Sequence, residues 1–156
     1  KRQISASAIE GIVQARMLRP SMMVVTTEVE GSPSPEETVE VTNNHLARLQ
    51  REKIAAIRDS IWSLNASRGL NWLFITDSDA DLEHEDWKRR LLWQLFCRFD
   101  VGRDLHFDET GTRVAWDATV PIPSDDGPLP VRRWPAVTLH DPEMVSRVDA
   151  WLSQRI

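Results

Sequence analysis

The apolar residues of this chain gather in short runs, separated by longer stretches in which apolar positions follow a helical spacing. Two runs are compact and rich in β-branched residues, at 22–29 (MMVVTTEV) and 71–77 (NWLFITD). Residues 112–119 (TRVAWDAT) instead alternate between apolar and polar positions. Both patterns are typical of strands, because a fully buried strand is apolar throughout and a half-buried one exposes every second side chain. The sequence therefore predicts three strands.

Helices are predicted where apolar residues recur every three or four positions. The segments with this spacing are 5–18, 36–67, 84–99 and 142–152. The last begins at Asp141-Pro142, because Asp is a favourable N-cap and proline suits the first helical position. Residues 30–37 and 120–136 are rich in proline, which predicts a loop and an extended excursion.

Strands that alternate with helices predict a small α/β fold, with a mixed or mostly parallel sheet flanked by helices. A length of 156 residues fits one domain with a sizeable core. We therefore expect a single domain over 1–156, with the excursion at 120–136 as part of it. The chain opens with Lys1 rather than Met, which is compatible with a piece of a longer polypeptide.

Composition narrows the possible partners. The net charge of −5 argues against nucleic acid or an anionic membrane surface, because both require clustered Lys and Arg. No apolar run is long enough to span a bilayer. Cys97 is the only cysteine, so no internal disulfide can form, and its place on an apolar helix predicts a core position. These features favour a cytoplasmic protein.

The most distinctive local pattern is an acidic segment after the strand at 71–77. Six acidic residues lie between Asp77 and Asp86. Asp77, Asp79 and Asp81 fit the start of a calcium-binding loop, but Leu82 stands where that loop needs Gly. The bidentate Glu at its twelfth position is also replaced, here by Lys88. An EF-hand-like site is therefore not expected.

Two other interpretations of this segment remain. An apolar strand followed by Asp-x-Asp resembles the haloacid-dehalogenase signature, in which Asp77 would attack phosphorus, Asp79 would act as general acid and magnesium would neutralise charge. Asp81 departs from the usual Thr or Val of that signature. The preferred interpretation is a strand-to-helix loop whose acids cap the helix that begins near His84.

The remaining residue types give weaker signals. The four histidines show no metal-ligand spacing, and they are His45, His84, His106 and His140. No Gly-rich phosphate loop is present in the sequence. Among the seven tryptophans, Trp134 lies in the proline-rich excursion and is a candidate interface anchor, because exposed Trp is typical of binding hot spots.

Charged and apolar residues are closely mixed at 93–104 (WQLFCRFDVGRD). At the end of a helix, Arg98 and Arg103 can bond the terminal carbonyls while they pair with Asp100 and Asp104. These four residues therefore predict a structural corner that needs no ligand.

The order of these motifs resembles the C-terminal domain of the UbiD-type decarboxylases, the 3-polyprenyl-4-hydroxybenzoate carboxy-lyase family. The strand LFITDSDAD, the helix and corner DWKRRLLWQLFCRFDVGRD, the strand TRVAWDAT and the closing RRWPAVTLHDPEMVSRVDAWL each resemble a family segment. Matching positions include Arg98, Asp100, Asp117, Ala118 and Thr119. The resemblance covers residues 71–156 well and 22–29 weakly.

The resemblance implies reversible, non-oxidative decarboxylation of aromatic or unsaturated acids on prenylated FMN, with a divalent metal and potassium, and a link to ubiquinone biosynthesis. The family's flavin fold and catalytic residues lie in preceding domains, and its C-terminal domain dimerises the enzyme and closes over the active site. The implied partner is a second copy or a larger decarboxylase subunit. Glu28 stands where the family has a Lys that reaches the flavin phosphate, so we expect no cofactor on this chain alone.

Overall fold

The helices and strands of this chain follow an alternating order. The computed structural model describes residues 9–28, 43–64, 67–125 and 142–153. The elements are β1 (Ile12–Arg19), β2 (Met22–Thr27), α1 (Asn44–Ser63), β3 (Trp72–Asp77), the short 3-10 helix η3 (Ser78–Ala80), α2 (Trp87–Arg98), α3 (Val101–Asp104), β4 (Leu105–Phe107), β5 (Val114–Ala118) and α4 (Pro142–Ser153).

The five strands form one mixed sheet in the order β1-β2-β3-β5-β4. The three central strands β2, β3 and β5 are parallel, and the edge strands β1 and β4 are antiparallel to their neighbours. The predicted α/β fold with a mixed sheet is therefore confirmed. Because parallel strands end at the same edge, the side chains that terminate β3 and β5 meet there, with Asp117 directly beside Ile75.

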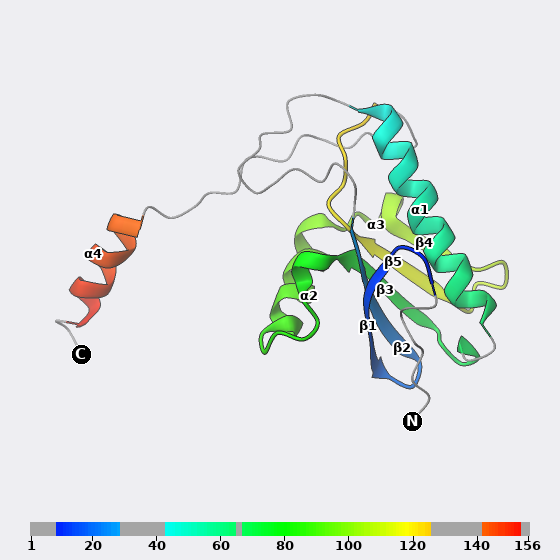
Figure 1. Cartoon of the computed structure of the whole chain (residues 1–156), viewed down its shortest axis with the longest axis horizontal. Coiled ribbons are helices and arrows are strands. Elements are labelled where there is room, and N and C mark those ends of the chain that lie inside the picture. Colours follow the sequence, from blue (N-terminus) through cyan, green and yellow to red (C-terminus); the bar gives the residue numbers. More distant parts are fainter. Residues whose placement is uncertain (1–8, 29–42, 65–66, 126–141, 154–156) are drawn as a thin grey trace.

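The helices α1 and α2 cover opposite faces of the sheet (Figure 1). Alternation along β3 separates the two cores, because successive side chains point to opposite faces. Leu73 and Ile75 pack with Ile57 and its neighbours on α1, whereas Phe74 packs with Leu91 of α2. The carboxyl edge of the sheet thus lies between two packed helices.

The expected helix at 5–18 is wrong, because residues 12–19 form strand β1. This segment pairs antiparallel with β2, and the turn at Pro20 joins the two strands rather than ending a helix. Short apolar segments satisfy both periodicities, so pairing with a neighbouring strand decides between them. Here Ile12 and Ala15 pack against the α1-side core.

The other predicted elements are found, with shifted ends. The N-cap of α1 is Asn43, whose Oδ1 accepts the Leu46 N–H at 3.0 Å. The predicted loop at 30–37 and the predicted helix start at residue 36 lie outside the described residues. Helix α2 begins at Trp87 instead of residue 84, because turns at His84 precede it. The predicted closing helix is confirmed as α4, and Asp141 lies outside the described residues.

Candidate functional site

Asp77 ends strand β3 and is the centre of a polar network at the carboxyl edge of the sheet. Its Oδ2 accepts the backbone N–H of Val120 at 2.8 Å and Arg98 Nη1 at 2.9 Å. Its Oδ1 is buried and has no partner among the described residues. Burial raises the pKa of Asp77 to about 6, against the opposing effects of the Val120 hydrogen bond and Arg98.

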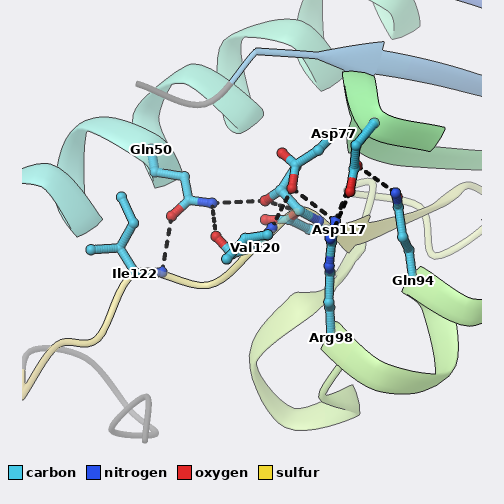
Figure 2. A network of polar contacts seen from close by, with 9 residues as sticks. Gln50, Asp77, Gln94, Arg98, Asp117, Val120 and Ile122 are labelled. Carbon is cyan, nitrogen blue, oxygen red and sulfur yellow. Dashed lines mark hydrogen bonds and ion pairs between the residues drawn. The ribbon is translucent and has the colours of Figure 1, made fainter. Parts of the chain in front are cut away.

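Arg98 joins the end of α2 to the end of β3. Its Nη2 lies 2.9 Å from Oδ2 of Asp79, so one guanidinium bridges two carboxylates (Figure 2). Gln94, one turn earlier on α2, donates to Asp79 Oδ1 at 2.5 Å. The Arg98 guanidinium also lies over the Trp93 ring, 5.4 Å from its centroid. With only 10% of its side chain exposed, Arg98 is a buried cation held on several sides.

Asp117 extends the network from β5 toward α1. Its Oδ1 accepts both the backbone N–H and the hydroxyl of Thr119, at 3.0 and 2.7 Å. Gln50 of α1 then donates to Thr119 Oγ1 and to the Val120 carbonyl, both at 2.8 Å (Figure 2). Burial raises the pKa of Asp117 to about 7, with the neighbouring Asp104 and Asp77 acting in the same direction.

The predicted corner at 98–104 forms with different partners. Arg103 pairs with Asp104 at 2.6 Å and donates to the Arg98 carbonyl at 3.1 Å, as the sequence suggested. Arg98, however, lies against Asp77 and Asp79 and not against Asp100. Asp100 instead caps α3, where its Oδ1 accepts the Gly102 N–H at 2.9 Å. The corner is therefore continuous with the strand-end network.

The acidic loop does not have the geometry of either proposed metal chemistry. The described residues contain no group of three or more His, Cys, Asp or Glu side chains placed to hold a metal ion. Asp81 adopts a left-handed conformation with φ of 40°, and hydrogen bonds from Gln14 and the Glu83 N–H lower its pKa. Asp86 precedes α2 but makes no capping hydrogen bond through its side chain. Of the acids in this segment, Asp77 and Asp79 bind Arg98, whereas Asp86 pairs with Arg89.

Asp77 is poorly placed as a nucleophile for phosphoryl transfer. Only 9% of its side chain is exposed, and Oδ2 already binds Arg98 and the Val120 N–H. A nucleophilic carboxylate must reach its substrate with a free oxygen. The other oxygen, Oδ1, has no partner among the described residues but is buried, so the geometry does not favour a phosphatase.

The remaining candidates are scattered. His84 accepts the Asp86 N–H at 3.0 Å, and His45 lies 3.3 Å from Arg48. His106 lies at a small cavity beside Asp117, and burial lowers its pKa. The predicted core residue Cys97 is half-buried. The remaining two, His140 and Trp134, lie outside the described residues.

Sequence reasoning missed the two glutamines of the network. Gln50 falls on the apolar stripe of α1 between Ala47 and Ile54, and Gln94 lies on α2 between Leu91 and Leu95. A polar residue on a core-facing stripe must find a hydrogen-bond partner when it is buried. That position in the pattern is the signal that would have identified both side chains.

No family model matches this sequence, and no curated protein matches it. Among solved structures, the chain is similar to the vanillic acid decarboxylase ShVdcCD of Sedimentibacter hydroxybenzoicus in open form, with a TM-score of 0.49 and 14% identity over 95% of this chain and 30% of that chain. An evolved dimeric form of the UbiD-class enzyme HmfF from Pelotomaculum thermopropionicum, in complex with prFMN, gives a TM-score of 0.46 and 16% identity over 80% and 24%.

A structure of HmfF in complex with FMN gives a TM-score of 0.44 and 15% identity, covering 92% of this chain and 30% of that chain. The chain thus spans less than a third of the length of each of these structures. These similarities concern the path of the backbone only. Functional conclusions rest on the side chains and sequence motifs described above.

We predict that Arg98→Ala lowers the free energy of unfolding by about 1–3 kcal/mol, because it leaves the buried Asp77 carboxylate without its cation. The matched control is Arg89→Ala, which removes a solvent-exposed pair with Asp86 and should change stability by less than about 0.5 kcal/mol. Urea unfolding at pH 8, above the pKa of about 6 of Asp77, measures the difference. Equal stability of the two variants would contradict the buried ion pair.

Stability should also depend on pH through the raised pKa values of Asp77 and Asp117. The folded protein holds these protons more tightly than the unfolded chain, so their contribution is complete below about pH 4 and is lost as pH rises through about 6 and 7. His106, whose pKa is lowered, acts in the opposite direction. Asp117→Asn keeps an acceptor for Thr119 but cannot titrate, so it should flatten the decline between pH 6 and 8. Unfolding curves with the same pH slope in both proteins would refute the assignment.

Proposed function

We propose that this chain is the C-terminal domain of a UbiD-like carboxy-lyase, or a detached subunit related to one, and that it performs no decarboxylation by itself. In the complete enzyme it would serve as a dimerisation and lid domain beside the flavin-binding body. The body would decarboxylate aromatic or unsaturated acids. The proposal rests on where the residues of the sequence resemblance lie in the fold.

The observation that supports this proposal is the convergence of those residues. Asp77, Arg98, Asp104, Asp117 and Thr119 match the family pattern and are spread over more than forty positions of the sequence. In the fold Asp77, Arg98 and Asp117 lie at one edge of the sheet (Figure 2), and Asp104 is linked to Arg98 through Arg103. An ordered set of motifs that forms one network is more specific than any of its short motifs.

An apolar surface supports the role in assembly. Phe96 of α2 is 84% exposed, and Leu92 one turn before it and Trp93 are each more than half exposed. Val101 on α3 and Phe107 on β4 add further exposed apolar side chains. Apolar side chains that lie together on a surface mark an interaction site in soluble proteins. The partner would be a second copy or the body of a larger decarboxylase subunit.

The described residues do not fit an independent flavin site. Glu28, at the end of β2, places an exposed carboxylate where the family's Lys would meet the phosphate. The nearby cation Lys53 donates to the Glu28 carbonyl. A carboxylate repels a phosphate group, so prenylated FMN, the divalent metal and potassium would bind in the preceding domains.

The purified chain should be colourless and should not decarboxylate aromatic or unsaturated acids, even with added prenylated FMN and manganese. The reason is that Asp77 is bound by Arg98 and the Val120 N–H, and that the described residues do not fit a flavin site. Flavin absorbance after gel filtration and carbon dioxide release measure the two properties. Flavin retained at one equivalent per chain would overturn the proposal.

The exposed apolar side chains should cause self-association. Light scattering of the full chain should show a particle larger than the monomer at high concentration. The reason is that burying the exposed Phe96 and Leu92 side chains in an interface lowers the free energy. Phe96→Glu should reduce the association, and Glu52→Gln, an exposed residue of α1 on the opposite face of the sheet (Figure 1), serves as control. A strictly monomeric chain that is unaffected by Phe96→Glu would contradict self-association through α2.

A further inference from the structure

A small cavity lies between α1 and the strands β4 and β5, apart from the Asp77–Arg98 pair. Its volume is about 90 Å³. This is room for about three water molecules, or for an organic molecule of about five non-hydrogen atoms. One wall is apolar and includes Ile54, Ala55 and Ile122, whereas Asp117 and His106 contribute polar groups. The cavity is thus lined by both apolar and polar side chains.

Two polar groups at the cavity have unused hydrogen-bonding capacity. Both hydrogen bonds that Asp117 accepts from Thr119 fall on Oδ1, which leaves Oδ2 for a ligand. The ring of His106 makes no hydrogen bond within the described part of the chain. Asp104 also lines the cavity, but both of its oxygens are bound by Arg103 and the Asp100 N–H. Asp117 and His106 therefore have hydrogen-bonding capacity left for a ligand.

The charges around the cavity favour a monoanion that binds next to a neutral Asp117. Arg103 is paired with Asp104, and Arg58 is paired with Asp59 at 2.7 Å. The third cavity arginine, Arg51, is exposed and has no carboxylate partner among the described residues. When Asp117 is protonated, the positive charge of Arg51 is not balanced by a carboxylate at the cavity. A guanidinium matches a carboxylate in shape and charge, and a dianion would exceed the available charge.

We propose that this cavity binds a short-chain monocarboxylate of acetate to propionate size, whose carboxylate accepts a hydrogen bond from Asp117 and pairs with Arg51. The alkyl part lies against Ile54, Ala55 and Ile122. This site does not depend on the proposed decarboxylase relationship, because only groups within this domain form it. The raised pKa of Asp117 makes the protonated form accessible near neutral pH.

The first test is titration of the full chain with propionate at pH 6 by calorimetry. Wild type should bind one equivalent saturably. Ala55→Leu fills the cavity with a larger side chain and should abolish the heat of binding. The matched control is Ala56→Leu, on the next residue of α1, whose exposed side chain does not line this cavity. Absence of saturable binding to wild type, or equal binding by a folded Ala55→Leu, would overturn the site.

A second test isolates Asp117 from the other groups at the cavity, which are His106, Asp104, Arg51, Arg58 and Arg103. Wild type should bind propionate more weakly at pH 8 than at pH 6, because ionised Asp117 repels the carboxylate. Asp117→Asn retains a donor at both pH values, so its affinity should stay nearly constant. A variant that keeps the full pH dependence of wild type would refute the role of Asp117. This outcome is readable even if Ala55→Leu fails to fold.

Discussion

The buried pair between Arg98 and Asp77 is the interaction on which the arrangement of this domain depends. Isolated burial of a charge costs several kcal/mol, so a buried carboxylate requires a cation and hydrogen-bond donors. Asp77 receives both from distant parts of the chain, namely the end of α2 and the segment after β5. Oδ2 of Asp77 therefore holds both α2 and the segment that follows β5 against the end of β3.

The segment that follows β5 extends this constraint to α1. Gln50 holds the Val120 carbonyl and accepts the Ile122 N–H, and the Asn43 N–H bonds the Pro123 carbonyl at 2.9 Å. Ser124 and the Asp125 N–H bond Asn44 at the start of the helix. Residues 119–125 therefore run along α1 without forming a strand. The proline-rich excursion begins as a well-packed segment because side chains replace the missing sheet partner.

The sequence predicted those elements whose apolar pattern fits a strand or a helix but not both. β2, β3 and β5 are buried central strands, and continuous apolar or alternating runs identify them. β1 was mistaken for a helix because IVQARMLR has too few residues to separate the two periodicities, and pairing with β2 decided the outcome. A strand that forms mainly through pairing with its neighbour is difficult to recognise from its own sequence.

The ion pairs, too, were predictable from the sequence only where the partners are neighbours along the chain. Sequence proximity suggested Arg98 with Asp100, but Arg98 reaches Asp77, twenty-one positions away, because α2 packs with its C-terminal end at the carboxyl edge of the sheet. The local pair of Arg103 and Asp104 was predictable, since adjacent residues at a helix end stay adjacent in any fold. Long-range pairs become predictable only when the packing of the helix against the sheet is known.

Helix α2 carries side chains with different roles on its two sides. Leu91 and Gln94 face the sheet, and Gln94 and Arg98 lie within reach of Asp79 one turn apart. Phe96 and its exposed neighbours lie on the other side of the same helix. The ionic network joins one side of α2 to the end of β3, so it sets the orientation in which the other side would meet the proposed partner.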